Sequence, residues 1–87
     1  MRKIKEEKLI GEISHYYKKI SVAVLKLSCC LGIGDSIRIM GGRRTDFYQR
    51  VNSIEINHER IPVAEAGETI GIMVKEPVRE GYRVYKV

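Results

Sequence analysis

The chain has 87 residues, enough for one small domain, since domains typically run to about 100–150 residues. Its 44% hydrophobic and 31% charged content excludes a disordered chain and predicts a globular fold. So short a chain leaves little material for a deep catalytic cleft, which favours a binding module over an enzyme. The formal net charge is +5, and residues 1–50 hold 11 basic and 5 acidic side chains. This asymmetry favours an anionic partner, although a surplus of this size is also typical of charge kept for solubility.

One domain is expected to span residues 1–87, with the charged residues 1–8 as a flexible segment in front of it. No signal peptide follows that segment. The longest nearly apolar stretch, residues 20–27, is far shorter than the ~18 residues that a membrane span needs. We therefore expect a cytoplasmic protein without a membrane partner.

The two cysteines, Cys29 and Cys30, are adjacent in the sequence and cannot form a disulfide framework. Reduced thiols in a cytoplasmic protein are the simplest interpretation. Vicinal thiols can also bind a soft metal or sense redox state, with Lys26 as the one nearby cation. No further Cys or His lies at zinc-ligand spacing, so no metal or cofactor is expected.

Six segments combine alternating hydrophobicity with β-branched or aromatic residues, and none is long enough for a helix. These predicted strands span residues 9–14, 20–27, 36–40, 46–57, 69–76 and 82–87. In the second, Ile20, Val22 and Val24 point one way and the intervening apolar residues the other, which is typical of a central strand. In the fourth, the apolar parity changes near residues 52–53, which predicts a bulge or a sharp bend.

Glycines mark the turns between these strands, and Gly71 inside a strand indicates a bend or a close backbone approach. Six strands with one apolar face are better buried in a closed barrel than in an open sheet with two exposed edges. The sequence therefore predicts an all-β protein, a single small closed six-stranded antiparallel β-barrel related to the Greek key.

Five ordered segments, IGEI, IGDSIRI, VNSIEI, VAEAGETIGI and VREGYRV, are spread along the chain from about Gly11 onward. In this order they resemble the second domain of the translation elongation factor Tu family, a small β-barrel beside the GTP-binding domain. The resemblance implies a stand-alone translation-factor-like protein that contacts ribosomal RNA or tRNA. Similar barrels also occur as accessory modules, one of them at the C-terminus of some collagenase-like peptidases.

Catalysis is not expected. The chain has no Gly-x-x-x-x-Gly-Lys-Ser/Thr loop to hold phosphates, so it should not bind GTP by itself. Its two histidines, His15 and His58, stand in no recognisable triad or Cys–His signature.

Two stretches in the basic half mix cations with aromatic rings, the combination that neutralises phosphates and stacks on unpaired bases. The predicted nucleic-acid contacts are Tyr16, Tyr17, Lys18, Lys19, Arg43, Arg44 and Arg50. The simpler interpretation is that the rings belong to the core or rim and that the cations are solvated.

A second hypothesis is a protein-docking or accessory barrel that self-associates or binds a partner enzyme. Its candidate surface is Tyr82, Tyr85 and Val87, because the last strand has apolar residues on both faces.

Overall fold

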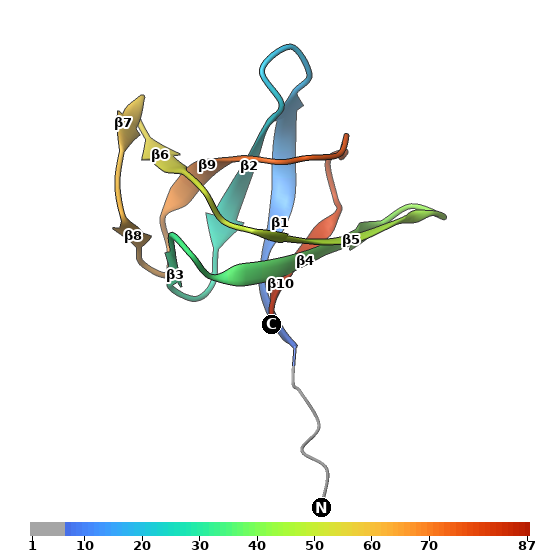
Figure 1. The fold of residues 1–87 in the computed structure, drawn as a ribbon, viewed down its shortest axis with the longest axis horizontal. Helices are drawn as coiled ribbons and strands as arrows, with labels where there is room; N and C mark the ends of the chain where they lie inside the picture. Colours follow the sequence, from blue (N-terminus) through green and yellow to red (C-terminus); the bar gives the residue numbers. More distant parts are fainter. Residues whose placement is uncertain (1–6) are drawn as a thin grey trace, which may run out of the picture.

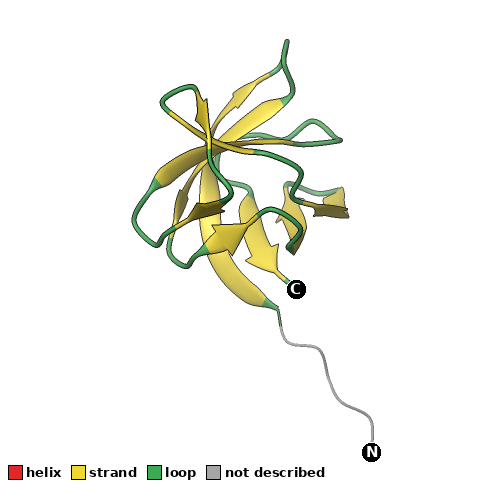
Figure 2. Ribbon diagram, turned by 60° about the vertical axis from the view of Figure 1, so that its left-hand side comes forward, coloured by secondary structure: helices red, strands yellow, loops and turns green. Residues whose placement is uncertain are grey.

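The computed structural model describes residues 7–87, and this part of the chain consists of β-strands joined by turns (Figures 1 and 2). Within it, no helix is long and apolar enough to cross a membrane. The strands are β1 (Lys8–Tyr17), β2 (Val22–Leu27), β3 (Leu31–Gly32), β4 (Ser36–Gly41), β5 (Thr45–Arg50), β6 (Ile54–Ile56), β7 (Glu59–Arg60), β8 (Val63–Ala64), β9 (Thr69–Met73) and β10 (Arg83–Lys86).

Eight strands form one curled sheet in the order β5-β4-β10-β1-β2-β9-β6-β7, and β3 pairs with β8. Every pairing is antiparallel. The all-β prediction is confirmed. The predicted strand over residues 46–57 is two strands, β5 and β6, so the change of apolar parity marks a break at residues 51–53. Gly34, Gly67 and Gly81 adopt φ of 92–96° in the predicted turns, a conformation that costs glycine little.

Strand β1 bends the sheet. Its inward residues Ile10, Ile13 and Tyr16 recur every third position instead of every second. The reason is an extra residue in β1 at two places, between Leu9 and Gly11 against β10 and between Ile13 and His15 against β2. Such bulges increase the local bend and twist. They let one strand serve two halves of a curled sheet.

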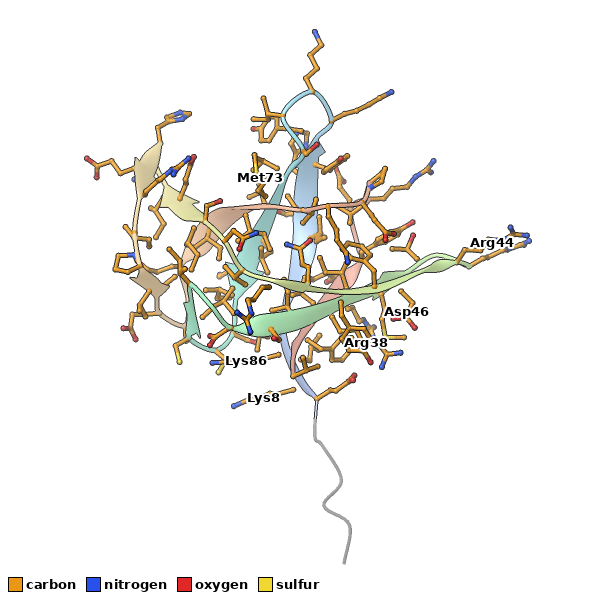
Figure 3. All side chains as sticks on the ribbon, viewed as in Figure 1. Lys8, Arg38, Arg44, Asp46, Met73 and Lys86 are labelled. Carbon is orange, nitrogen blue, oxygen red and sulfur yellow. The ribbon has the colours of Figure 1, made fainter. Side chains whose placement is uncertain are left out.

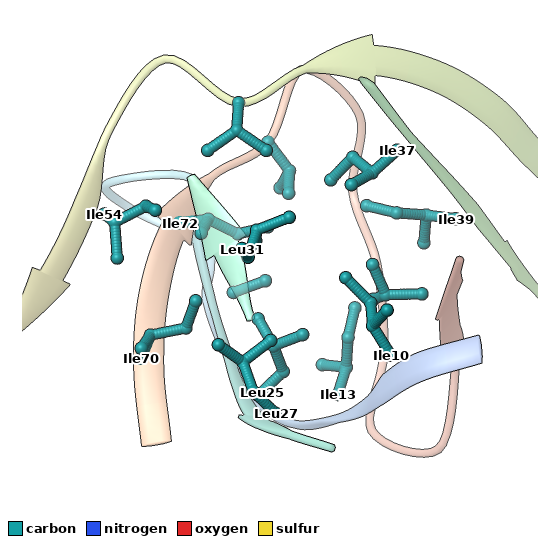
Figure 4. Close-up of a cluster of buried hydrophobic side chains, with 14 of the residues drawn as sticks. Ile10, Ile13, Leu25, Leu27, Leu31, Ile37, Ile39, Ile54, Ile70 and Ile72 are labelled. Atoms are coloured by element: carbon teal, nitrogen blue, oxygen red, sulfur yellow. The ribbon is translucent and has the colours of Figure 1, made fainter. Parts of the chain in front are cut away.

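The concave side of the sheet encloses an aliphatic core (Figure 4). β2, β4 and β9 each contribute alternate residues to it, and Leu31, Val51, Val74 and Val78 fill it from loops and short strands. Fully buried side chains include Ile10, Ile13, Leu25, Ile37, Ile39, Ile54 and Val84. No polar or charged residue of the described chain is buried. Each aliphatic side chain removed from water contributes about 1.5–3 kcal/mol, so this face supplies most of the stability.

The prediction of a closed six-stranded barrel is wrong, because the hydrogen-bonded sheet is open with β5 and β7 at its edges. Gln49 joins β5 to the end of β9 instead. Its side-chain Nε2 donates to the Met73 carbonyl at 2.9 Å, and its Oε1 accepts from the Lys75 amide at 2.9 Å. The side-chain amide thus imitates one step of a β-ladder between two segments that curl toward each other.

On the outer face of β4 and β5, four side chains form a polar network. Arg38 donates through Nε and Nη2 to both carboxylate oxygens of Asp46 at 2.7 Å, and through Nη1 to Glu7 at 2.9 Å. The Arg38 guanidinium lies 5.0 Å from the centroid of the Tyr48 ring, whose hydroxyl donates to Glu7 at 3.1 Å. The hydrogen bonds that Arg38 donates, first to Asp46 and then to Glu7, raise the pKa of Arg38, and the bond that Asp46 accepts from Arg38 lowers the pKa of Asp46.

The segment predicted to be flexible, residues 1–8, falls largely on residues 1–6, which lie outside the described residues. Its last two members do not fit that prediction. Glu7 is held by Arg38, and Lys8 begins β1 opposite Lys86 (Figure 3).

Replacing Gln49 by Leu should lower the free energy of unfolding by about 1–2 kcal/mol, because two hydrogen bonds each contribute about 0.5–1.5 kcal/mol net. Urea unfolding measures the loss. Asn52→Ala, which changes an exposed side chain in the neighbouring loop, is the matched control and should leave stability unchanged. Equal stability of Gln49→Leu and the control would show that the junction between β5 and the end of β9 does not depend on the Gln49 side chain.

The Arg38–Asp46 pair should make the protein less stable in acid. The pKa of Asp46 in the folded state is below its ordinary value of 3.8, so its contribution is present above that pH and is lost as the pH falls further. Urea midpoints at about pH 5 and about pH 2.5 should therefore differ less for Asp46→Asn than for the wild type. Glu59→Gln, at an exposed position of β7, should keep the wild-type difference.

Candidate functional site

The outer face of β1, β2 and β9 carries apolar side chains in register. One cross-strand row joins Tyr17, Val22 and Met73. Beside it, His15, Val24 and Gly71 form a second row, which continues on β6 as Glu55. Directly opposed residues on one face of a sheet lie in contact range. These strands therefore present a connected apolar surface to solvent.

The turn between β1 and β2 adds Ile20 to this surface. Ser21 adopts φ 57°, a left-handed conformation, and the turn leaves Ile20 58% exposed at the hairpin tip. Tyr17 and Met73 are 51% and 54% exposed. We call Tyr17, Ile20, Val22, Val24 and Met73 the apolar face.

A groove of about 510 Å³ crosses the apolar face where Gly71 leaves no side chain. Val22 and Val24 line it, and the β6–β7 turn of Asn57 and His58 forms part of its wall. A Cβ on Gly71 would lie 3.2 Å from Cγ1 of Val22, so the valine occupies part of the space that a larger residue would need. The close approach predicted at Gly71 is thus a side-chain contact.

Both residues of the β6–β7 turn have left-handed backbone, with φ 53° at Asn57 and 68° at His58. Two successive positive φ values in a two-residue hairpin define a type I′ turn, in which Asn suits the first position and Gly the second. His58 occupies the position where Gly would be least strained. Its imidazole stands at the groove.

Cations flank the apolar face. Lys18 and Lys19 stand exposed at the hairpin tip, and Lys75 follows β9 after Val74. The one carboxylate on the groove wall, Glu55, is paired with Arg60 at 3.8 Å. Lysines therefore stand at two sides of the face, and the carboxylate of Glu80 lies beside His15.

The seven predicted nucleic-acid contacts do not form one surface. Tyr17, Lys18 and Lys19 lie together at the β1–β2 hairpin, whereas Tyr16 packs against the core. Arg43 and Arg44 stand at the tip of the β4–β5 hairpin, which projects from the body in a different direction (Figure 3). Arg50 lies at the other end of β5.

The predicted docking surface at the C-terminus is not an open apolar patch. The Tyr82 ring lies against Gly41. A Cβ on residue 41 would overlap this ring. Tyr85 is in β10, an interior strand between β1 and β4, and is only partly exposed. The Val87 amide donates to the Ser36 carbonyl at 3.0 Å. Tyr82 precedes β10 and packs against the core and the β4–β5 hairpin, so it does not belong to an exposed patch.

The histidines and cysteines are dispersed over the described residues. His15 packs edge-on against Tyr17, with ring centroids 4.3 Å apart, and its Nδ1 lies 3.7 Å from Glu80. Cys29 is partly buried against the core and Cys30 is exposed, both as free thiols. Residues 7–87 contain no group of three His, Cys, Asp or Glu that could hold a metal ion.

Sequence reasoning missed most of the apolar face. Ile20 was expected inside a strand, and Val22 and Val24 were expected to be buried on the second face of a central strand. A signal for an exposed apolar surface was present, because β2 has apolar side chains on both faces of the sheet and only one of these faces is buried. Met73 and the His58 turn had no distinguishing signal in the sequence.

No protein-family model matches this sequence. The chain is 42% identical over 76 residues to a protein of Methanocaldococcus jannaschii named as an uncharacterized protease. The match covers 87% of this chain and 19% of the protease, so the chain spans about a fifth of its relative.

Two solved structures share the fold. Both are of the C-terminal domain of a Geobacillus thermoleovorans protein assigned to the U32 peptidases, one of them the selenomethionine variant. The variant has a TM-score of 0.83 at 16% identity and covers 88% of this chain and 96% of that chain. The other has a TM-score of 0.85 at 17% identity and covers 92% of each.

These findings correct the expected family. The relatives are named as a protease and as the C-terminal domain of a U32 peptidase, so the assignment to elongation factor Tu is wrong. The predicted RNA- or ribosome-binding function is contradicted with it, and the alternative of a self-associating or enzyme-docking barrel fits no better. The physical reason is that glycine turns and β-branched alternation specify a curled antiparallel sheet, which does not determine function.

Substituting His58 by Gly should raise the free energy of unfolding by up to about 1 kcal/mol, because glycine accepts a positive φ without steric cost. Thermal and urea unfolding measure the change. His58→Ala keeps a Cβ in the same backbone conformation and should give no gain. A loss of stability in His58→Gly would show that the imidazole itself holds the turn together.

Proposed function

We propose that this chain serves as a non-catalytic domain of a U32-type peptidase, in which another part of the protein performs hydrolysis. One observation carries the proposal, namely 42% identity to a protease over 76 residues. The fold supports it, because the sheet matches a peptidase C-terminal domain across 96% of that domain.

The size of the match supports a non-catalytic role. It occupies 19% of the protease, so about four-fifths of that protein lies outside the matched segment and has room for the chemistry. In the described residues, His15 is engaged by Tyr17 and Glu80, and His58 sits on a strained surface turn. Hydrolysis by a nucleophile needs a base held against it by a third group, and neither environment resembles that arrangement.

We propose the cytoplasm as the compartment in which the chain works. Cys29 and Cys30 are both free thiols, one of them exposed, and such thiols persist in a reducing environment.

A domain exchange tests the proposed function. The isolated chain should release no fragments from fluorescein-labelled casein. The Geobacillus protein with its own C-terminal domain replaced by this chain should cleave casein with a KM severalfold lower than the same protein truncated before that domain. Binding energy from a part remote from the reaction would produce this difference.

An unrelated β-domain of similar size in the same position is the control and should behave like the truncated protein. Casein hydrolysis by the isolated chain would contradict the non-catalytic role. A chimera no better than the truncated protein would contradict the assignment to the peptidase system.

A further inference from the structure

The apolar face differs from the rest of the outer surface. Around Arg38, the outer side chains of β4 and β5 satisfy one another through ion pairs and hydrogen bonds. On β1, β9 and the β1–β2 turn, exposed Tyr17, Met73 and Ile20 surround Val22 and Val24 of β2, which are partly exposed. Contiguous apolar surface on a small protein marks an interaction site.

Two features shape this surface beyond simple exposure. The groove at Gly71 has a volume of about 510 Å³, similar to other depressions of the described surface, and Val22 and Val24 line it. Its wall includes His58 at a backbone position that favours glycine. A strained residue that displays a polar ring beside an apolar floor is a feature that functional sites retain.

Charge identifies the occupant. Lys18 and Lys19 border the face at the hairpin, and Lys75 borders it beyond Met73, whereas Glu55 is already paired with Arg60. An occupant with an apolar side chain for the groove and carboxylates on either side would match both properties.

A second copy of the chain is a poor occupant. In a two-fold interface the same patch faces itself, so the lysines that border one copy would share the interface with those of the other. Nucleic acid is also a poor occupant, because four of the five residues of the apolar face are not aromatic and offer neither donors for phosphate nor rings for stacking, and Tyr17 alone could stack on a base.

We propose that the apolar face binds a polypeptide segment in which a large apolar side chain enters the groove at Gly71 and flanking Asp or Glu residues meet Lys18, Lys19 and Lys75. The proposal of peptide binding depends only on the observations of this surface. That the segment belongs to a peptidase substrate rests on the proposed function. The domain would then select acidic stretches with an apolar centre.

The test uses a fluorescein-labelled synthetic peptide in which a Leu-Phe pair is flanked on both sides by Asp and Glu. Fluorescence anisotropy with the full chain should show saturable binding that weakens as salt rises, because screening reduces the contribution of the lysines. A peptide with Ser-Ser at the centre and one with Lys in place of the acids should both bind at least about tenfold more weakly.

Matched variants locate the site. Ile20→Ser should weaken binding at least about fivefold, whereas Ile33→Ser, at an isoleucine 51% exposed elsewhere, should not change it. Lys18→Glu with Lys19→Glu should weaken binding severalfold, whereas Arg43→Glu with Arg44→Glu should leave it unchanged. Both pairs lie at hairpin tips, and amide NMR spectra establish that each variant is folded.

Several outcomes would overturn the proposal. They are absence of peptide binding up to about 1 mM, equal effects of Ile20→Ser and Ile33→Ser, and equal effects of the two charge reversals. A concentration-dependent dimer that Ile20→Ser abolishes would assign the face to a second copy. Ile20-dependent binding to vesicles of anionic lipid would assign it to a membrane surface. None of these measurements involves a peptidase, so they stand apart from the domain-exchange result.

Discussion

The Gln49 carboxamide holds together a sheet that its own backbone ladders do not close. A single sheet must curl to bury one apolar face, and curling brings β5 toward the end of β9. The bulges in β1 supply the bend, and Gln49 satisfies the Met73 carbonyl and the Lys75 amide where the two segments meet. With these hydrogen bonds in place, aliphatic side chains fill the interior, and none of the described polar residues is buried.

The inner face of the sheet supplies the core, and the two halves of the outer face have different chemistry. On β4 and β5, the Arg38 network anchors Glu7 through charged hydrogen bonds, which are stronger than neutral ones. On β1, β2 and β9, valines and larger apolar side chains meet water instead. Because the inner face already provides the core, the exposed side chains of the other half contribute little to stability. Their presence is better explained by binding.

The sequence predicted the parts of the fold that depend on local patterns. Alternation identified the main strands, and the parity change near residues 52–53 correctly located the break between β5 and β6. It could not show that the backbone ladder stays open between β5 and the end of β9. There the Gln49 side chain bridges the two segments, and its partners lie more than 20 positions away in the sequence. Ile20 was misplaced for a similar reason. Pairing extends β1 to Tyr17, which puts Ile20 in the turn.

The wrong family assignment has the same origin as the correct predictions of the fold. Turn glycines and β-branched alternation are requirements of a curled antiparallel sheet, so they recur wherever that sheet is used. Identity of 42% to a protease includes positions that the fold does not dictate, and it therefore carries information that the pattern lacks.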